Sequence, residues 1–206
     1  MNIIAHRGFW LKPEEKNSEA AFKRAFENGF GVETDLRQYD GRLIVSHDPP
    51  VQPVFEFARF LELAALSGTT LAINTKEDGL APDLAEAMND HPDTDWFAFD
   101  MAVPDMLPHF ARGLPTFTRI SDIEPEPVCE KETQGVWLDA FYGDWWSLDV
   151  LDNILATGKR LAIVSPELHG RDYQKVWKML ANWDNPARNQ VLICTDHPDK
   201  CREMLG

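Results

Sequence analysis

The alternation of strand-like and helix-like segments constrains the fold of this 206-residue chain more than any other feature of its sequence. Short apolar runs predict eight strands, at residues 3–6, 31–35, 70–75, 96–100, 116–120, 136–139, 160–164 and 190–195. Helical periodicity lies between them, at residues 18–28, 54–66, 82–90, 104–111, 148–157 and 173–183, with a further short helix expected within 128–133. Strands joined by helical crossovers form a parallel sheet, and eight of them predict an α/β fold, a single (β/α)8 TIM barrel.

The composition is that of an ordinary globular protein with a strongly acidic balance. The hydrophobic fraction is 44% and the formal net charge is −14. Nucleic acids and anionic membranes bind basic surfaces, so the charge argues against both as partners, and nothing indicates an obligate protein partner. The three cysteines are odd in number and lack metal-ligand spacing, which favours reduced thiols and a cytoplasmic location.

A turn signal at Asp40-Gly41 fixes the local geometry after the second predicted strand. Both residue types tolerate the positive φ that a two-residue hairpin loop requires. If these residues form the loop, Tyr39 pairs with Arg42, and counting back along the two strands sets His47 opposite Thr34. We therefore expect His47 beside the two acidic residues that flank Thr34 in the sequence.

Polar side chains follow the first three predicted strands, where a parallel barrel places its active site. They are His6 and Arg7 on the first strand, Glu33 and Asp35 on the second, and Asn74 and Lys76 on the third. Later strands are expected to bring further polar groups to the same end, from Asp100, Asp139, Glu167 and Thr195.

Glu33, Asp35 and Asn74 have the side-chain oxygens of a metal site. Glu33 and Asp35 are two residues apart, so both side chains leave the strand from one face. Surface salt bridges would be the alternative, but two like charges on one face of an inner strand are costly without a cation. Carboxylate and amide oxygens suit a hard divalent metal, Mg²⁺ or Ca²⁺, which makes this metal the expected cofactor.

The remaining predicted site residues suit a small phosphodiester substrate. Arg7 can bind a phosphate through its planar fork of donors, and Lys76 shares a strand face with Asn74. His6 and His47 can act as acid and base, because imidazole exchanges protons near neutral pH. A bound metal, Arg7 and Lys76 would together offset the acidic charge of the chain at this site.

The chain resembles the glycerophosphodiester phosphodiesterase family, within the superfamily of phosphatidylinositol-phospholipase-C-like barrels. The resemblance rests on residues 3–8, on Asn17-Ser18 with the helix that follows, on residues 31–48 and on residues 195–199. It implies one barrel domain over residues 1–206 that hydrolyses phosphodiesters. In that family a substrate hydroxyl attacks phosphorus with one histidine as base, the other histidine protonates the leaving alkoxide, and water opens the cyclic phosphate. Carried over, these roles fall to His6 and His47 in either order.

Two departures from the family leave its chemistry open. The third strand of the family ends in Glu-x-Lys, with the Glu as metal ligand, whereas this chain has Asn74 there. The usual insertion after the second-strand hairpin is also missing. The alternatives are an enzyme that binds its metal weakly, a metal site shifted toward Asp100 or Asp139, a barrel that binds phosphorylated ligands without catalysis, or a lyase that releases a cyclic phosphate.

Several polar residues have a structural interpretation beside a functional one. Asn17 is expected either to cap the first helix or to join the site. The other histidines, His91, His109, His169 and His197, are expected in loops or helices that face solvent.

Overall fold

Eight parallel strands form a closed ring in this computed structural model, which describes residues 1–206. In ring order they are β1 (Asn2–His6), β2 (Gly31–Tyr39), β5 (Leu71–Thr75), β6 (Trp96–Phe99), β7 (Phe117–Ile120), β8 (Gly135–Leu138), β9 (Arg160–Val164) and β10 (Leu192–Thr195). One parallel bridge, between Ala98 and Thr116, joins β6 to β7, and the Ala98 N–H donates to Pro115 O at 2.8 Å. Each predicted strand coincides with one of these eight, which confirms the barrel.

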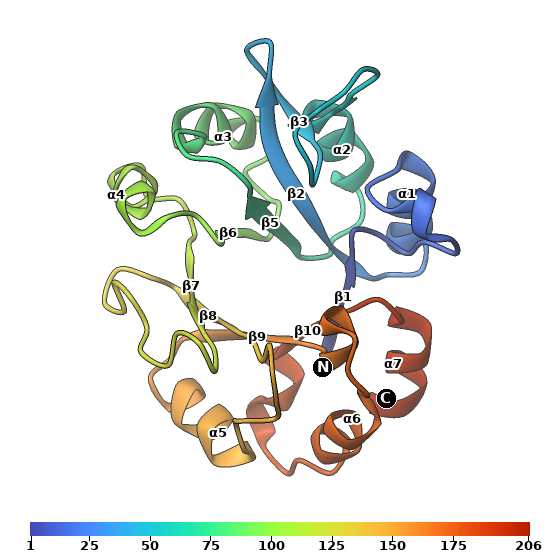
Figure 1. Cartoon of the computed structure of the whole chain (residues 1–206), viewed down its shortest axis with the longest axis vertical. Coiled ribbons are helices and arrows are strands. Elements are labelled where there is room, and N and C mark those ends of the chain that lie inside the picture. The colour runs from blue at the N-terminus through green and yellow to red at the C-terminus, as the bar shows by residue number, and fades with distance from the viewer.

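Seven helices surround the ring (Figure 1). They are α1 (Glu19–Glu27), α2 (Phe57–Ala64), α3 (Ala81–Asn89), α4 (Val103–Ala111), α5 (Leu148–Ala156), α6 (Gln174–Ala181) and α7 (Pro198–Leu205). The first six coincide with predicted helices, whereas α7 was not predicted. None of the seven is long and apolar enough to cross a membrane.

The short helix expected within 128–133 does not form. This stretch consists of turns, and Cys129 has a φ of 52°, which a right-handed helix cannot include. The turns connect β7 to β8 and take the place of a crossover helix.

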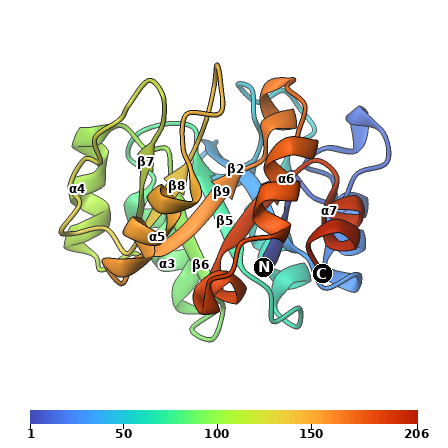
Figure 2. The same cartoon turned by 90° about the horizontal axis from the view of Figure 1, so that it is seen from below.

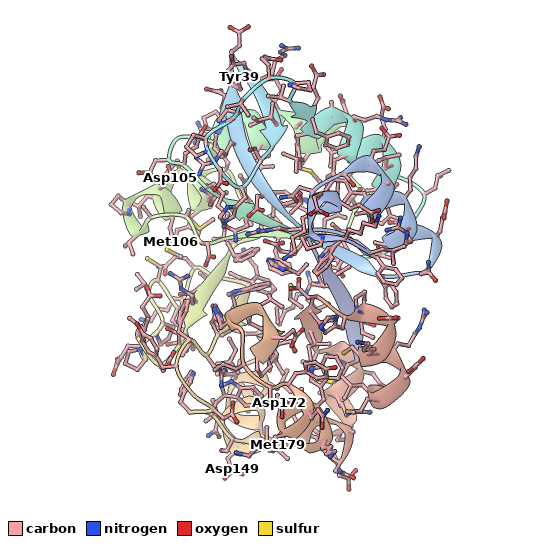
Figure 3. The ribbon with its side chains drawn as sticks, turned by 45° about the vertical axis from the view of Figure 1, so that its right-hand side comes forward. Tyr39, Asp105, Met106, Asp149, Asp172 and Met179 are labelled. Atoms are coloured by element: carbon pink, nitrogen blue, oxygen red, sulfur yellow. The ribbon has the colours of Figure 1, made fainter.

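The hairpin that follows β2 has the predicted register. Tyr39 pairs with Arg42 across the Asp40-Gly41 turn, and both turn residues have positive φ, 51° and 72°. The pairing with β3 (Arg42–Val45) ends at Val45, and β3 pairs in turn with the short β4 (Phe55–Glu56). Tyr39 lies at the outer tip of the hairpin, at the top of Figure 3, so the hairpin projects away from the ring.

Apolar side chains fill the interior of the ring. Phe97 stacks on Phe117 with 3.7 Å between ring centroids, and Phe99 stacks on Trp137 at 3.9 Å. These rings come from β6, β7 and β8, the part of the ring where only one bridge joins two strands. The packed interior therefore supports the barrel where its backbone hydrogen bonding is weakest.

Two larger apolar clusters lie between the sheet and the surrounding helices. The long connections after β1, β7 and β8 gather at one end of the barrel, the upper end in Figure 2. That end is the carboxyl end of the strands, and it holds the predicted site residues.

Candidate active site

The apolar interior of the ring gives way to polar side chains at the carboxyl ends of its strands. Because alternate residues point inward, the next inward position lies two residues beyond each of the interior residues Ile4, Ala72, Phe117, Trp137 and Cys194. Those positions hold His6, Asn74, Arg119, Asp139 and Asp196. Five strands thus direct polar side chains into one mouth.

His6 is held by a carboxylate that was assigned no role from the sequence. Its Nδ1 lies 2.7 Å from Asp196 Oδ1, and both side chains are 15% exposed. Burial raises the pKa of Asp196, but the hydrogen bond and charge of His6 together with Lys16 outweigh it, so the pKa lies below its ordinary value. The other ring nitrogen of His6 lies 3.9 Å from Glu33 Oε2. The pairing was missed because it joins residues 190 positions apart, although Asp196 has the inward position after buried Cys194.

Arg7 adopts a strained backbone conformation that brings it against both acidic residues of β2. Its φ is 57°, a left-handed value that non-glycine residues rarely adopt. The Arg7 N–H lies 2.9 Å from Glu33 O and 3.2 Å from Glu33 Oε2. The Arg7 side chain meets Asp35, with 2.8 Å between Nε and Oδ2.

Asp35 is fully buried and surrounded by donors. Besides Arg7, Lys76 Nζ lies 3.1 Å from Asp35 Oδ1, and Asn17 Nδ2 donates to Asp35 Oδ2 at 2.8 Å. Burial alone would raise the pKa of Asp35, but Lys76 and Arg7 hold it below its ordinary value. Asn17 is thus part of the site, while Ser18 caps α1 by accepting from the Ala21 N–H.

Glu33 has the opposite electrostatic environment. It is only 2% exposed, and its nearest basic side-chain atom is His6 Nε2 at 3.9 Å. Burial raises the pKa of Glu33, and the neighbouring charge of Asp35 raises it further. A cation bound near Glu33 would stabilise its charged carboxylate and so oppose the rise in pKa.

Asn74 lies beside Asp35 in the sheet register, with a buried Oδ1 atom that has no hydrogen-bond partner. Its Nδ2 donates to Asp100 Oδ2 at 3.3 Å, and Asp100 pairs with Arg119 at 3.2 Å. No group of three His, Cys, Asp or Glu side chains is placed to hold a metal ion, and the third oxygen of the predicted set belongs to an amide. The unsatisfied Oδ1 and the under-compensated Glu33 carboxylate nevertheless fit a hard cation.

His47 lies at the rim of the mouth. The Ser46 N–H still donates to Asp35 O at 3.0 Å, but the strand pairing has ended one residue earlier. The His47 side chain is 47% exposed, and its ring bonds to Asp48, which is 86% exposed. The structure shows no hydrogen bond or ion pair between His47 and the β2 carboxylates.

Of the four histidines expected to face solvent, one is fully buried and the other three are partly buried. His109 is fully buried in α4, where its Nδ1 lies 2.8 Å from Asp105 O. His169 ends the 3-10 turn η2 (Pro166–His169) and lies 2.6 Å from the buried Asp139. These contacts of His109 and His169 could not be read from the local sequence, because loop and helix patterns do not show which connection folds over the barrel.

A separate hollow of about 410 Å³ lies at the other end of the barrel. It is lined by the amino-terminal parts of β1, β2 and β10 with residues from several connecting loops. In barrels of this kind, polar residues at that end contribute to stability rather than to chemistry.

Comparisons with known proteins bear on the fold. No protein-family model and no curated protein matches the sequence. Among solved structures, a glycerophosphodiester phosphodiesterase from Parabacteroides distasonis has a TM-score of 0.69 and 19% identity, over 99% of this chain and 96% of that one. A phosphodiesterase from Oleispira antarctica, solved with its product sn-glycerol-3-phosphate, has a TM-score of 0.72 and 15% identity, over 100% and 96%.

A third similar structure is a Ca²⁺-dependent phosphatidylinositol-specific phospholipase C from Streptomyces antibioticus. Its TM-score is 0.60 at 12% identity, over 100% of this chain and 96% of that one. At such identities the likeness concerns the fold: this chain has the (β/α)8 barrel seen in these phosphodiesterases and in that phospholipase C.

Proposed function

We propose that this chain is a divergent member of the glycerophosphodiester phosphodiesterase family and hydrolyses small phosphodiesters at the carboxyl end of its barrel. The observation that carries the proposal is the His6–Asp196 pair, set beside Glu33, Asp35 and Arg7 at the mouth. An oriented imidazole, a guanidinium and two buried carboxylates are the parts that attack on a phosphodiester requires. The shared fold adds support, although a barrel alone does not specify a reaction.

The reaction needs two proton transfers. Asp196 accepts the Nδ1 proton of His6, which leaves Nε2 to exchange a proton with the substrate. One histidine takes the proton of the attacking O–H group, and a second gives a proton to the leaving alkoxide as the P–O bond breaks. The sequence predicts His47 for the second role.

Arg7 and Lys76 are the proposed phosphate ligands. Both already face Asp35, so their charges are fixed in the mouth before substrate arrives. A phosphate oxygen that approaches Arg7 would meet a planar group of donors without a large rearrangement.

A divalent metal, Mg²⁺ or Ca²⁺, would be held by Glu33, Asp35 and the free Oδ1 of Asn74. Such an ion, when bound, offsets the negative charge that develops on the phosphoryl oxygens. Because an amide replaces the third carboxylate of the family, we expect weak binding.

A glycerophosphodiester is the substrate class we propose, by analogy with the relative whose structure contains sn-glycerol-3-phosphate as product. A barrel that binds phosphodiesters without turnover is the second candidate. It is favoured by Asn74 and by the two cations that already neutralise Asp35.

The test is turnover of a glycerophosphodiester panel by the purified protein with Mg²⁺, Ca²⁺ or EDTA, with products separated by chromatography. The proposal predicts a phosphomonoester and a free alcohol. Accumulation of a cyclic phosphate would identify a lyase instead, and binding of the diesters without any turnover would establish the second candidate.

A further inference from the structure

A second histidine–carboxylate pair lies in the same mouth. His169 Nε2 is 2.6 Å from Asp139 Oδ1, and the Asp139 side chain is only 6% exposed. The His169 ring packs against Phe141 with 4.6 Å between ring centroids. The imidazole itself keeps 24% of its surface open. It is therefore fixed on one side and accessible on the other, as His6 is.

Glu167 links this pair to His6. Its Oε1 accepts from the Asp196 N–H at 3.1 Å and also from the Thr195 hydroxyl. Its Oε2 accepts from the Ser165 hydroxyl, which in turn accepts from Trp177 Nε1 at 2.8 Å. Glu167 belongs to η2, the turn that ends at His169, so this hydrogen-bonded set positions both imidazoles relative to each other.

The two imidazoles belong to separated parts of the ring. His6 ends β1, and Asp139, which holds His169, follows β8, with β9 and β10 between those two strands. His6 and Asp139 both occupy inward positions at the carboxyl ends of their strands. The two histidines therefore border the mouth from different sides.

His47 lacks comparable support. Its ring bonds only to the exposed Asp48, and no buried group holds it. Proton transfer depends on a donor or acceptor held within about 3 Å of the reacting oxygen. A fixed imidazole meets that requirement without the entropy cost of ordering a mobile side chain.

We infer that His169, positioned by Asp139, is the second acid–base residue of the phosphodiesterase site, opposite His6. The inference rests on the proposed function. The attacking oxygen bonds to phosphorus as its proton passes to one imidazole. The P–O bond to the leaving group breaks, its electron pair departs with the alkoxide, and the other imidazole supplies the proton that completes the alcohol.

The experiment compares steady-state hydrolysis of the best diester of the panel by His169→Ala and Asp139→Asn with that by the wild type. His91→Asn is the matched control, a histidine between α3 and β6 at the opposite end of the barrel. We expect His169→Ala to lower kcat at least 100-fold, the usual range for an acid–base group, with KM within threefold. Added imidazole should restore part of that loss. Asp139→Asn, which keeps the shape of the side chain, should lower kcat about tenfold or more.

Turnover by His169→Ala within threefold of wild type would overturn the inference and leave the proposed function standing. Wild-type protein that turns over no diester would refute the proposed function itself. Thermal unfolding of each variant identifies loss of the fold. If His169→Ala does not fold, the kcat of Asp139→Asn decides the outcome.

Discussion

At the scale of single residues, two neighbouring carboxylates on one strand have pKa values shifted in opposite directions. Lys76 and Arg7 outweigh the effect of burial on the pKa of Asp35, whereas burial and the charge of Asp35 outweigh the nearby basic groups at Glu33. The sequence predicted that these side chains share a face, because strand alternation is a local rule. It could not predict which of the two would be compensated, because that depends on where the side chains of β1 and β5 lie.

Glu33→Gln should stabilise the metal-free protein at neutral pH while it abolishes turnover. The folded-state pKa of Glu33 is raised above 4.5, so the folded state binds more protons than the unfolded state as pH rises past that value. Wild-type stability therefore falls across this interval, and the neutral glutamine avoids the loss. Denaturant unfolding in EDTA should show a gain for the variant at pH 7.5 that disappears below pH 4.5. An equal gain at both pH values would contradict this explanation.

Asn74→Glu should strengthen metal binding. The change restores a third carboxylate beside Asp35, and affinity of oxygen sites for divalent cations rises with ligand charge. We expect the Mg²⁺ or Ca²⁺ concentration that gives half-maximal turnover to fall by about tenfold or more. Asn74→Ala is the matched control, and it should raise that concentration. An unchanged metal requirement in both variants would place the metal elsewhere.

At the scale of secondary-structure elements, the sequence predicted what local rules control. The Asp40-Gly41 turn fixed the register of β2 with β3, and the alternating pattern located all eight barrel strands. The position of His47 was extrapolated beyond the last paired residue, where register no longer constrains the chain. The missed helix α7 begins with proline after a strand motif, so its short pattern was absorbed into the preceding loop.

Gly31→Ala should destabilise the barrel where β2 begins. A Cβ atom at this residue would lie 2.6 Å from Thr70 O, a backbone atom in the crossover to β5 that cannot move independently. We expect a loss of about 1–3 kcal/mol in the free energy of unfolding, as for other overpacked sites. Gly143→Ala, where a Cβ would meet nothing within 4 Å, is the control. Equal stability of the two variants in denaturant titrations would refute the steric argument.

At the scale of the whole molecule, the acidic charge is not reversed at the mouth by free cations. Five basic side chains each pair with a carboxylate: Arg7, Lys76, Lys16, Arg119 and Arg171. A local excess of positive charge was expected there, but the pairing of these side chains depends on contacts between distant strands. A net charge of −14 should therefore repel an anionic diester from a distance.

Salt should consequently raise kcat/KM for an anionic diester. Screening shortens the reach of the protein's field from about 30 Å at 0.01 M ionic strength to about 8 Å at 0.15 M. We expect a rise of roughly twofold or more across this range, measured with a non-coordinating salt at fixed metal concentration. A fall in kcat/KM would mean that positive charge at the mouth governs substrate approach.

The barrel itself was predictable because its eight-fold alternation recurs along the whole chain. The sequence predicted the site residues at the ends of the first strands, but not the contacts that join distant strands at the mouth. His6, Arg7, Glu33 and Asp35 lie in one short stretch near the start of the sequence, whereas Asp139, His169 and Asp196 come together only when β8, β9 and β10 complete the ring.

The most direct test of the proposed active site is the kcat of His6→Ala compared with that of the wild type, on the preferred glycerophosphodiester with saturating metal. We expect a loss of at least 100-fold in kcat with an unchanged thermal unfolding midpoint, because His6 exchanges a proton with the substrate. Turnover by His6→Ala at the wild-type rate would exclude His6 from proton transfer and refute the proposed site.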